Sequence, residues 1–330
     1  MNGSLARSLP LQLRVMARLE QRQVKRLGGS PRQVLRSMTP RQRQLGPPPR
    51  WIGKPGPKDL DVRDLQLAGR DGAVVVRVYR APELTGELPA VLYLHGGGWA
   101  MGSIESCDPV CRRMTRAVGA VVVSVEYRLA PEHPFPAGLH DCVDALAWLR
   151  AEAEELQVDT RRIAVMGDSA GGNLCAALTL LDRDAGSSPA LAGQVLLYPG
   201  LRVAAEDPWT RDYDGPGLQA ADCQEIVEMY LGDAGVDPSD PRVSPAAAED
   251  LTGLPQALVV TAGVDILREQ GRTYVEQLTA AGVPARWSNY PRMPHGFYGS
   301  DRLAKDARRA QDEVHQELRR MFAQVLVRQP

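Results

Sequence analysis

Short apolar runs alternate with helical stretches through most of this 330-residue chain, and this alternation limits the possible folds more than any other feature. The apolar runs occupy residues 90–94, 120–127, 162–166, 195–198, 257–262 and 285–290, and the helical stretches lie near 108–118, 137–155, 171–184, 221–231, 267–281 and 302–327. Continuous apolar strands are typical of a parallel sheet that is buried on both faces, and parallel neighbours need a crossover helix. The pattern therefore predicts a single α/β domain.

Two regions depart from this alternation. Residues 62–67 and 73–79 are β-rich and flank a turn from Gly69 to Gly72, which predicts an antiparallel hairpin ahead of the parallel strands. Residues 200–250 are rich in Pro, Asp and Ala and interrupt the rhythm, so we expect an insertion that carries its own helix.

The first 50 residues differ from the rest of the chain in charge. They hold ten Arg and one Lys against a single acidic residue, Glu20, although the whole chain has 39 basic and 40 acidic residues. Apolar residues recur at helical spacing over residues 9–27, with arginines on another face. Ser30-Pro31 is typical of the start of a second helix, and Gly46-Pro-Pro-Pro49 predicts the end of the segment.

This charge asymmetry favours a helical cap that lies on the acidic remainder of the chain. We predict an N-terminal helical cap segment at residues 1–55 and a second unit at residues 56–330 that contains the insertion at about 200–250. A membrane-surface helix and a nucleic-acid patch are the alternatives. No aromatic residues interleave the arginines, so we expect no nucleic-acid partner.

Hydropathy and cysteine usage point to the cytoplasm. No apolar stretch reaches the roughly 18–20 residues that a membrane helix needs, and the N-terminus lacks an apolar signal-peptide core, so we expect no stable membrane insertion. The five cysteines are an odd number, which argues against a disulfide framework. Cys107 and Cys111 have the spacing to face one another on a helix, but no second pair of ligands accompanies them and we expect no metal.

Residues 163–172 have the pattern of a nucleophile elbow. An apolar run ends at Gly167, Ser169 lies between Gly167 and Gly171, and a helical stretch follows. Such a turn holds its serine in a strained backbone conformation at the end of a strand, and small neighbours prevent collisions. Glycine and serine are common here, so Gly-x-Ser-x-Gly is a weak signal alone and needs support from the rest of the chain.

A serine nucleophile needs a base, and His295 has the most suitable position among the five histidines. It lies on a loop after the last predicted strand, whereas His315 falls within a charged helix where we expect a solvated surface role. A third group must orient the imidazole, and Asp265 directly follows the apolar run 257–262. Its alternative role is to cap the helix that begins near Leu267.

The run His95-Gly-Gly-Gly-Trp99 follows the apolar run 90–94 and is the rarest pattern in the chain. Consecutive glycines let backbone N–H groups approach and bind an anion, which suits a developing oxyanion. A phosphate-binding loop is the rival interpretation, but the sequence lacks Gly-Lys-Ser/Thr and has no Gly-x-Gly-x-x-Gly that opens a helix. Trp99 either lines the pocket or packs in the core, and Asp168 is expected to be a structural hydrogen-bonding group.

Four motifs together resemble the hormone-sensitive-lipase family of α/β-hydrolases, whose bacterial members are often called family IV esterases. They are His-Gly-Gly-Gly-Trp at 95–99, Tyr-Arg-Leu-Ala-Pro-Glu at 127–132, Gly-Asp-Ser-Ala-Gly-Gly-Asn at 167–173 and His-Gly-Phe at 295–297. The resemblance covers residues 60–325. It implies an α/β-hydrolase fold, that is, a mostly parallel eight-stranded sheet flanked by helices. It also implies that residues 56–330 form the catalytic domain and that the N-terminal segment and the insertion at about 200–250 together form a helical cap over the active site. We expect the cap to shape the substrate pocket.

The resemblance also implies a role for each site residue. Ser169 would be the nucleophile, His295 the general base and then acid, Asp265 the orienting carboxylate, and the N–H groups of Gly97, Gly98 and Ala170 the oxyanion hole. Members of the family commonly hydrolyse short-to-medium acyl esters without a metal or cofactor, and they often form homodimers. The chain departs from the usual Asp-Pro-Leu-Arg-Asp-Glu-Gly by reading Asp-Ile-Leu-Arg-Glu-Gln-Gly at 265–271, and its arginine-rich N-terminus matches no motif.

Two other functions remain open at the level of the sequence. An amidase or deacetylase would use the same three residues, because acyl chemistry does not encode the leaving group. A ligand-binding receptor on the same fold, as in the plant gibberellin receptors, would lack the catalytic histidine, whereas His295 is present here.

Overall fold

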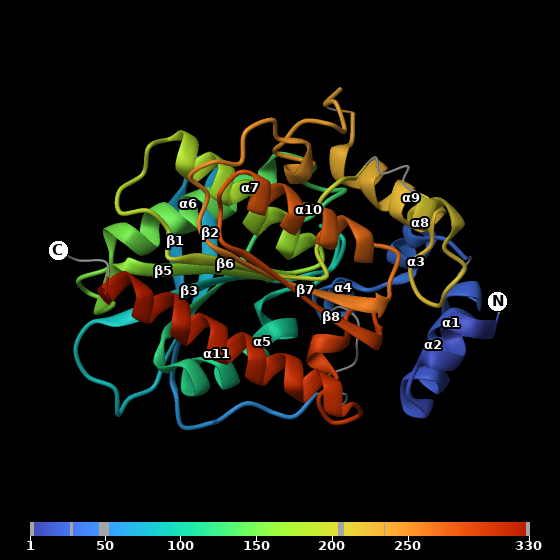
Figure 1. Ribbon diagram of the computed structural model, residues 1–330, viewed down its shortest axis with the longest axis horizontal. Coiled ribbons are helices and arrows are strands. Elements are labelled where there is room, and N and C mark those ends of the chain that lie inside the picture. The colour runs from blue at the N-terminus through green and yellow to red at the C-terminus, as the bar shows by residue number, and fades with distance from the viewer. Residues whose placement is uncertain (1–2, 27–28, 46–52, 204–207, 234, 328–330) are drawn as a thin grey trace.

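The computed structural model describes residues 3–26, 29–45, 53–203, 208–233 and 235–327, and an eight-stranded sheet runs through its centre (Figure 1). The strands are β1 (Asp61–Gly69), β2 (Gly72–Arg80), β3 (Leu88–Leu94), β4 (Val121–Glu126), β5 (Val158–Asp168), β6 (Gly193–Leu197), β7 (Ala257–Val264) and β8 (Ala285–Pro294), in the order β1-β2-β4-β3-β5-β6-β7-β8. Only the β1–β2 and β2–β4 pairs are antiparallel. The predicted mostly parallel sheet and its leading hairpin are confirmed.

The burial of each strand explains its sequence. Every residue of β6 and β7 is buried, and both strands are almost entirely apolar because helices cover both of their faces. β8 lies at the edge of the sheet, and only Tyr290 and Met293 among its residues are buried. The hairpin pairs Gly69 with Gly72, and Gly72 has a φ of 136°, a conformation that glycine adopts without strain.

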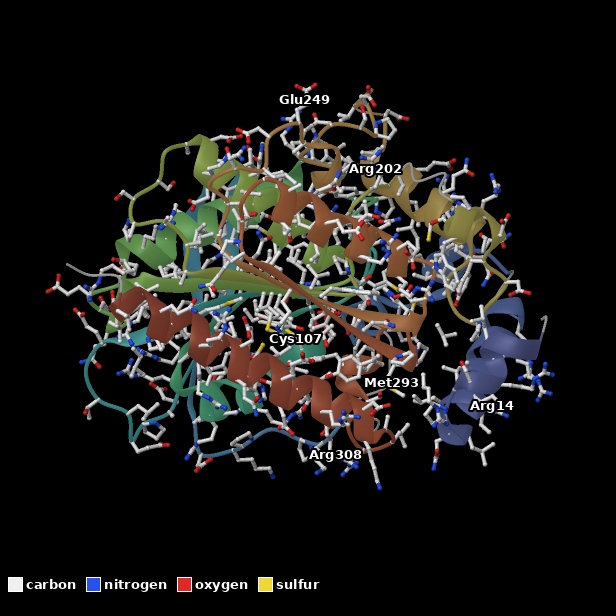
Figure 2. All side chains as sticks on the ribbon, viewed as in Figure 1. Arg14, Cys107, Arg202, Glu249, Met293 and Arg308 are labelled. Carbon is white, nitrogen blue, oxygen red and sulfur yellow. The ribbon has the colours of Figure 1, made fainter. Side chains whose placement is uncertain are left out.

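Two layers of helices enclose the sheet (Figure 1). One face is covered by α6 (Ala137–Ala151), α7 (Ala170–Asp184) and α10 (Arg268–Ala280), and the other by α5 (Ile104–Met114) and α11 (Lys305–Val327). Each layer encloses its own apolar core. Cys107 and Met293 both lie in the core on the α5 and α11 side (Figure 2). Within the described ranges, every helix is too short or too polar to cross a membrane.

The predicted helical stretches are confirmed with shifts of a few residues at their ends, but the prediction for His315 is wrong. The 302–327 stretch is α11, and its apolar stripe packs on the sheet with Val314 and Leu318. His315 lies beside that stripe and is 8% exposed, so it is not a solvated surface residue. Burial lowers the pKa of its imidazole to about 4, which keeps the side chain neutral.

Six further helices come from the N-terminal segment and from the insertion. Ser30 caps one of them, with Pro31 at its first position as predicted, whereas three short helices, at Gly3–Ser8 and near Arg43 and Trp209, were not predicted. Leu27 and Gly46-Pro-Pro-Pro49, which were predicted to end helical segments, lie outside the described residues. The helices are α1 (Gly3–Ser8), α2 (Leu11–Arg26), α3 (Pro31–Ser37), α4 (Pro40–Leu45), α8 (Pro208–Asp212) and α9 (Ala220–Leu231).

The N-terminal segment and the insertion contact each other. α3 packs on α9, and the Ser30 hydroxyl donates a hydrogen bond to Glu225 Oε1 at 3.1 Å. Arg32 lies 3.7 Å from the same carboxylate, so the basic segment meets an acidic helix face as its charge predicts.

Asn173 joins the insertion to the body of the protein. It is fully buried on α7, and its Nδ2 donates hydrogen bonds to the carbonyl oxygens of Gly200 and Val243, both at 2.8 Å. These two carbonyls belong to opposite ends of the insertion, so one amide group holds both ends against the sheet.

Replacement of this amide tests its structural role. We expect Asn173→Ala to lower the free energy of unfolding by about 2–4 kcal/mol, because two buried carbonyl groups lose their donor. Urea unfolding followed by circular dichroism measures the loss. Gln224→Ala on the exposed face of α9 is the control and should change stability by less than about 0.5 kcal/mol. Equal stability of Asn173→Ala and the wild type would contradict this account.

Candidate active site

Ser169, Asp265 and His295 all follow the carboxyl ends of parallel strands, where ligands bind in open α/β sheets. Ser169 comes directly after β5, Asp265 after β7 and His295 after β8. Since β5, β6, β7 and β8 are neighbours in that order, the sheet brings together three residues that lie far apart in the sequence.

The backbone at Ser169 is strained. Its φ of 54° and ψ of −118° lie outside the regions that a serine ordinarily adopts, at a cost of roughly 1–3 kcal/mol. Its N–H donates a hydrogen bond to the Leu197 carbonyl at 2.8 Å, and its own carbonyl accepts one from the Asn173 N–H at 3.1 Å. These contacts hold the strand-to-helix turn in place, as the elbow pattern predicts.

The small residues around Ser169 are required by steric contacts. A Cβ atom at Gly171 would overlap the carbonyl oxygen of Leu94, and one at Gly167 would overlap the carbonyl oxygen of Gly171. A Cβ atom at Gly172 would lie 2.9 Å from Cβ of Pro199. The helix can therefore start directly under Ser169 only because three neighbouring residues lack side chains.

The structure brings the three predicted side chains into one hydrogen-bonded chain. His295 Nε2 lies 2.9 Å from Ser169 Oγ, and His295 Nδ1 lies 2.8 Å from Asp265 Oδ2. Asp265 Oδ1 accepts a hydrogen bond from the Leu267 N–H at 3.0 Å, so the carboxylate serves both the imidazole and the start of α10. The two roles that the sequence left as alternatives for Asp265 are compatible.

The charge of Asp265 controls the protonation of His295. Burial lowers the pKa of the imidazole, but attraction to Asp265, the hydrogen bond between them and the more distant Asp168 raise it by more, so the pKa lies above its ordinary value. The Tyr198 ring stands edge-on to the imidazole with centroids 4.9 Å apart. This contact restricts how His295 can turn.

The glycine run after β3 adopts the backbone conformations that only glycine tolerates well. Gly97 has a φ of 131° and Gly98 a φ of 61°, and Trp99 also has a positive φ of 56°. Within the part of the chain that the structure describes, the N–H groups of Gly97 and Gly98 donate no hydrogen bond. Ala170 is the first residue of α7, and its N–H is one of the donors that a helix start leaves unpaired.

His95 and Asp168 are structural neighbours of this glycine run. His95 stacks on Tyr127 with ring centroids 4.2 Å apart, and burial lowers the pKa of its imidazole to about 4. Asp168 Oδ1 accepts hydrogen bonds from the Gly96 N–H at 3.0 Å and the Tyr93 hydroxyl at 2.8 Å. Asp168 therefore ties the glycine run to the elbow, which agrees with its predicted structural role.

Aromatic residues complete the surroundings of the site, and sequence reasoning missed two of them. Trp99 is 6% exposed and stacks on Tyr230 of α9, with ring centroids 4.3 Å apart, which favours the packing role. Trp209 of α8 donates its indole N–H to the Asp265 carbonyl at 2.9 Å. The position of Tyr198 at a strand end was a usable signal, whereas nothing in the insertion sequence marked Trp209.

Among the described residues, no three histidine, cysteine or carboxylate side chains gather as a metal site. His133 is exposed, and His140 lies 3.2 Å from Asp71 at the surface. His295 is thus the histidine that the structure brings to Ser169.

Comparison with known proteins gives consistent results. A family model described as the alpha/beta hydrolase fold matches residues 91–299. The carboxylesterase NlhH of Mycobacterium tuberculosis is 42% identical over 264 residues, which are 78% of this chain and 80% of that protein. The solved esterase of the archaeon Pyrobaculum calidifontis is 41% identical with a TM-score of 0.75 and covers 79% of this chain and 85% of its own. An ester hydrolase from the Lake Arreo metagenome is 34% identical with a TM-score of 0.85, covering 96% and 99%.

The raised pKa of His295 gives a test of the pair with Asp265. We expect the imidazole to titrate above about 6.5 in the wild type and below that value in Asp265→Asn, because burial then acts without the carboxylate charge. Nuclear magnetic resonance of the histidine ring measures both midpoints, and His315, with its pKa of about 4, is the internal reference.

The same pair links folding stability to pH. Because the folded-state pKa of His295 is raised, its stabilising effect is full below the unfolded value and is lost as pH rises through the folded value. The difference in free energy of unfolding between wild type and Asp265→Asn should therefore decrease as the pH rises from about 6.5 to the pKa of His295 in the folded wild type. An unchanged or higher His295 midpoint in Asp265→Asn would contradict this electrostatic account.

Proposed function

The chain belongs to the hormone-sensitive-lipase family of α/β-hydrolases, and from this membership we propose that it is a serine carboxylic-ester hydrolase that works through an acyl-enzyme. NlhH, the Pyrobaculum calidifontis protein and the Lake Arreo protein are named as esterases or ester hydrolases. The observation that carries the proposal is the hydrogen-bonded chain from Ser169 through His295 to Asp265.

In the proposed acylation step, His295 acts as a general base. As Ser169 Oγ attacks the ester carbonyl carbon, its proton passes to His295 Nε2, which already lies 2.9 Å away. The tetrahedral intermediate then expels the alcohol, which takes the proton from His295. Water attacks the resulting acyl-serine with His295 again as base, so the carboxylic acid leaves and Ser169 regains its proton.

Asp265 supports both steps without transferring a proton itself. Its hydrogen bond to His295 Nδ1 leaves Nε2 free to accept the serine proton, and its charge stabilises the imidazolium that forms. The buried position of Asp265 strengthens this attraction, because little water screens the two groups.

The proposed oxyanion hole consists of the N–H groups of Gly97, Gly98 and Ala170. In the described chain the N–H groups of the two glycines donate no hydrogen bond, and the Ala170 N–H is one that the start of α7 leaves unpaired, which supports this role. In related chemistry, the loss of one such donor lowers kcat by a factor of about 10²–10³. No cofactor or metal takes part in the mechanism that we propose.

We further propose that residues 1–55 and the insertion act as a cap that selects short-to-medium acyl chains. Leu35 of α3 is buried in a cluster with Ala100 and Met229, against which Ile226 packs. A Cβ atom at Gly98 would lie only 3.0 Å from Ile226 Cγ2, so this cluster reaches the proposed oxyanion hole. An apolar wall at that point suits an acyl substituent.

Two further properties belong to the proposal. All five cysteines are free thiols, which supports a location in the reducing cytoplasm. A homodimer rests on the family resemblance alone, and sedimentation analysis of the purified protein tests it.

Removal of the proposed nucleophile tests the function. We expect Ser169→Ala to lower kcat/KM on p-nitrophenyl acetate by about 10⁴-fold or more, because the acyl-enzyme cannot form. A fluorophosphonate probe should label the wild type and leave this variant unlabelled. Ser239→Ala, at an exposed serine, is the control. Wild-type turnover by Ser169→Ala would exclude the mechanism, and faster turnover of the matching anilide than of the ester would indicate an amidase.

A change at Leu35 tests the proposed cap. We expect Leu35→Ala to shift the preferred chain length upward in a series of p-nitrophenyl esters from C2 to C10, since the smaller side chain leaves more space beside Ile226. Leu11→Ala is the matched control, because Leu11 is exposed on α2. An unchanged profile in a folded Leu35→Ala protein would remove the N-terminal segment from the determinants of specificity.

A further inference from the structure

The segment from Gly97 to Ser103, called here the oxyanion loop, has an irregular backbone with few internal hydrogen bonds. In addition to Gly97, Gly98 and Trp99, Gly102 has a positive φ of 94°. Its internal backbone bonds run from the N–H groups of Ala100 and Met101 to the Gly97 carbonyl. A positive φ costs the glycines little, but it strains Trp99, and a strained residue persists only where its surroundings determine it.

One end of the loop is held by residues 127–132, the stretch that reads Tyr-Arg-Leu-Ala-Pro-Glu. The Ala130 N–H donates a hydrogen bond to the Trp99 carbonyl at 2.8 Å. Glu132 follows two residues later and is mostly exposed, so its carboxylate is available to another part of the chain.

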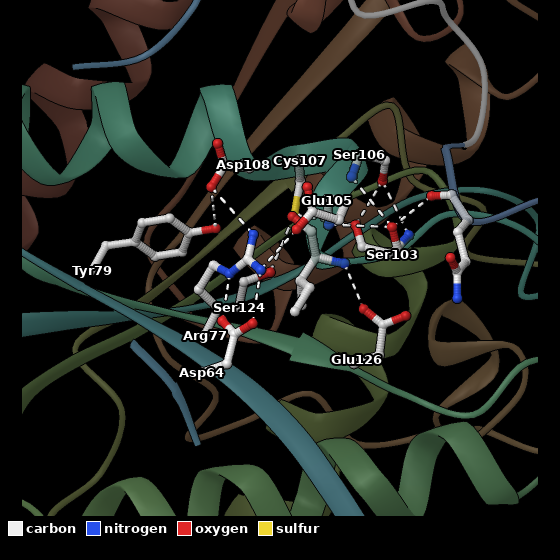
Figure 3. A network of polar contacts seen from close by, with 12 residues as sticks. Asp64, Arg77, Tyr79, Ser103, Glu105, Ser106, Cys107, Asp108, Ser124 and Glu126 are labelled. Carbon is white, nitrogen blue, oxygen red and sulfur yellow. Dashed lines mark hydrogen bonds and ion pairs between the residues drawn. The ribbon is translucent and has the colours of Figure 1, made fainter. Parts of the chain in front are cut away.

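The other end of the loop is held by the last turn of α4. The Gly102 N–H donates to the Arg43 carbonyl at 2.9 Å, and the Ser103 hydroxyl donates to the Gln44 carbonyl at 2.5 Å. Ser103 also caps α5, and the Ile104 N–H bonds Glu126 Oε2 at 2.7 Å (Figure 3). The N-terminal segment thus contacts the loop at the point where α5 begins.

The Arg43 side chain connects these two ends. Its Nη1 donates a hydrogen bond to Glu132 Oε1 at 2.6 Å, and its Nε donates to the Leu35 carbonyl at 3.2 Å. A closed ring of contacts therefore runs from Trp99 through Ala130 and Glu132 to Arg43, and back to the loop at Gly102. The guanidinium is the member of the ring that comes from the N-terminal segment.

We propose that Arg43 is a positioning residue that holds the oxyanion loop in its active shape through Glu132 and Gly102. The catalytic part of this inference rests on the proposed ester hydrolysis, in which the N–H groups of Gly97 and Gly98 stabilise the oxyanion. Arg43 touches neither substrate nor Ser169 in this account. It acts on the transition state because a small displacement of an oxyanion donor lowers the rate strongly.

The test compares Arg43→Gln with Arg41→Gln, which removes the same charge from an exposed position of the same helix. An ion pair as exposed as Arg43–Glu132 adds little to folding stability, so we expect both variants to fold. For Arg43→Gln we expect kcat on p-nitrophenyl acetate to fall about tenfold with KM within about twofold, since only transition-state contacts change. Arg41→Gln should keep wild-type kinetics.

A thionoester substrate separates the oxyanion donors from the rest of the site. Its C=S sulfur accepts hydrogen bonds more weakly than a carbonyl oxygen, so the rate ratio of ester to thionoester reports how well the donors are aligned. We expect this ratio to fall in Arg43→Gln and to stay at the wild-type value in Arg41→Gln. The pH at which activity is half-maximal should not move, because His295 and Asp265 are untouched.

Glu132→Gln removes the other partner of the Arg43–Glu132 ion pair, and it tests the proposal if Arg43→Gln does not fold. The double variant should be no slower than either single variant if the two side chains act as a unit. Wild-type kcat and ester-to-thionoester ratio in folded Arg43→Gln or Glu132→Gln would overturn the proposal, as would an equal loss in Arg41→Gln.

Amide hydrogen exchange of the peptide that carries residues 97–103 provides a readout that does not depend on turnover. We expect faster exchange in Arg43→Gln than in Arg41→Gln or the wild type, because the carbonyl of residue 43, which accepts the Gly102 N–H, is no longer anchored through the side chain to Glu132. Unchanged exchange would overturn the positioning role. Wild-type protein without esterase activity but with this exchange difference would remove the proposed function and leave the structural role of Arg43 in place.

Discussion

The close approach of three backbone segments around Ser169 is the constraint on which the site depends. The end of β3, the turn after β5 and the end of β6 meet so closely that side chains at Gly167 and Gly171 would overlap carbonyl oxygens. The hydrogen bond from the Ser169 N–H to Leu197 fixes the turn while its φ is positive. The close backbone contacts and the strained turn therefore place the Ser169 hydroxyl at the end of the sheet, with the start of α7 directly beneath it.

Carboxylate partners distinguish the buried histidines. His95 and His315 are both buried without a hydrogen-bonded carboxylate in the described chain, and burial lowers the pKa of each to about 4. His295 is buried as well, but the charge and hydrogen bond of Asp265 raise its pKa above the ordinary value. A base that accepts and returns a proton near neutral pH requires this balance, which supports the role proposed for His295.

The N-terminal segment and the insertion contact the proposed catalytic site at different places. Trp209 reaches the Asp265 carbonyl from the insertion, and the guanidinium of Arg268 lies 3.6 Å from the centre of its indole ring. Arg43 and Leu35 reach the glycine run from the N-terminal side. Both parts of the proposed cap therefore contact elements that carry the proposed catalytic groups, so a cap in this protein would influence rate as well as substrate choice.

The sequence by itself determined the strands, most of the helices, the elbow and the three residues at the strand ends, because apolar periodicity and glycine spacing are local properties of the chain. Only the tertiary structure decided the contacts made by irregular segments. Examples are the contacts of Trp209 with Asp265, of Tyr198 with His295 and of Arg43 with Glu132. Each joins parts of the chain that no local pattern connects. His315 was misjudged for the same reason: charged neighbours along the helix suggested solvent, whereas the packing of α11 on the sheet buries its ring. Burial and long-range pairing depend on how elements pack, which a local pattern does not encode.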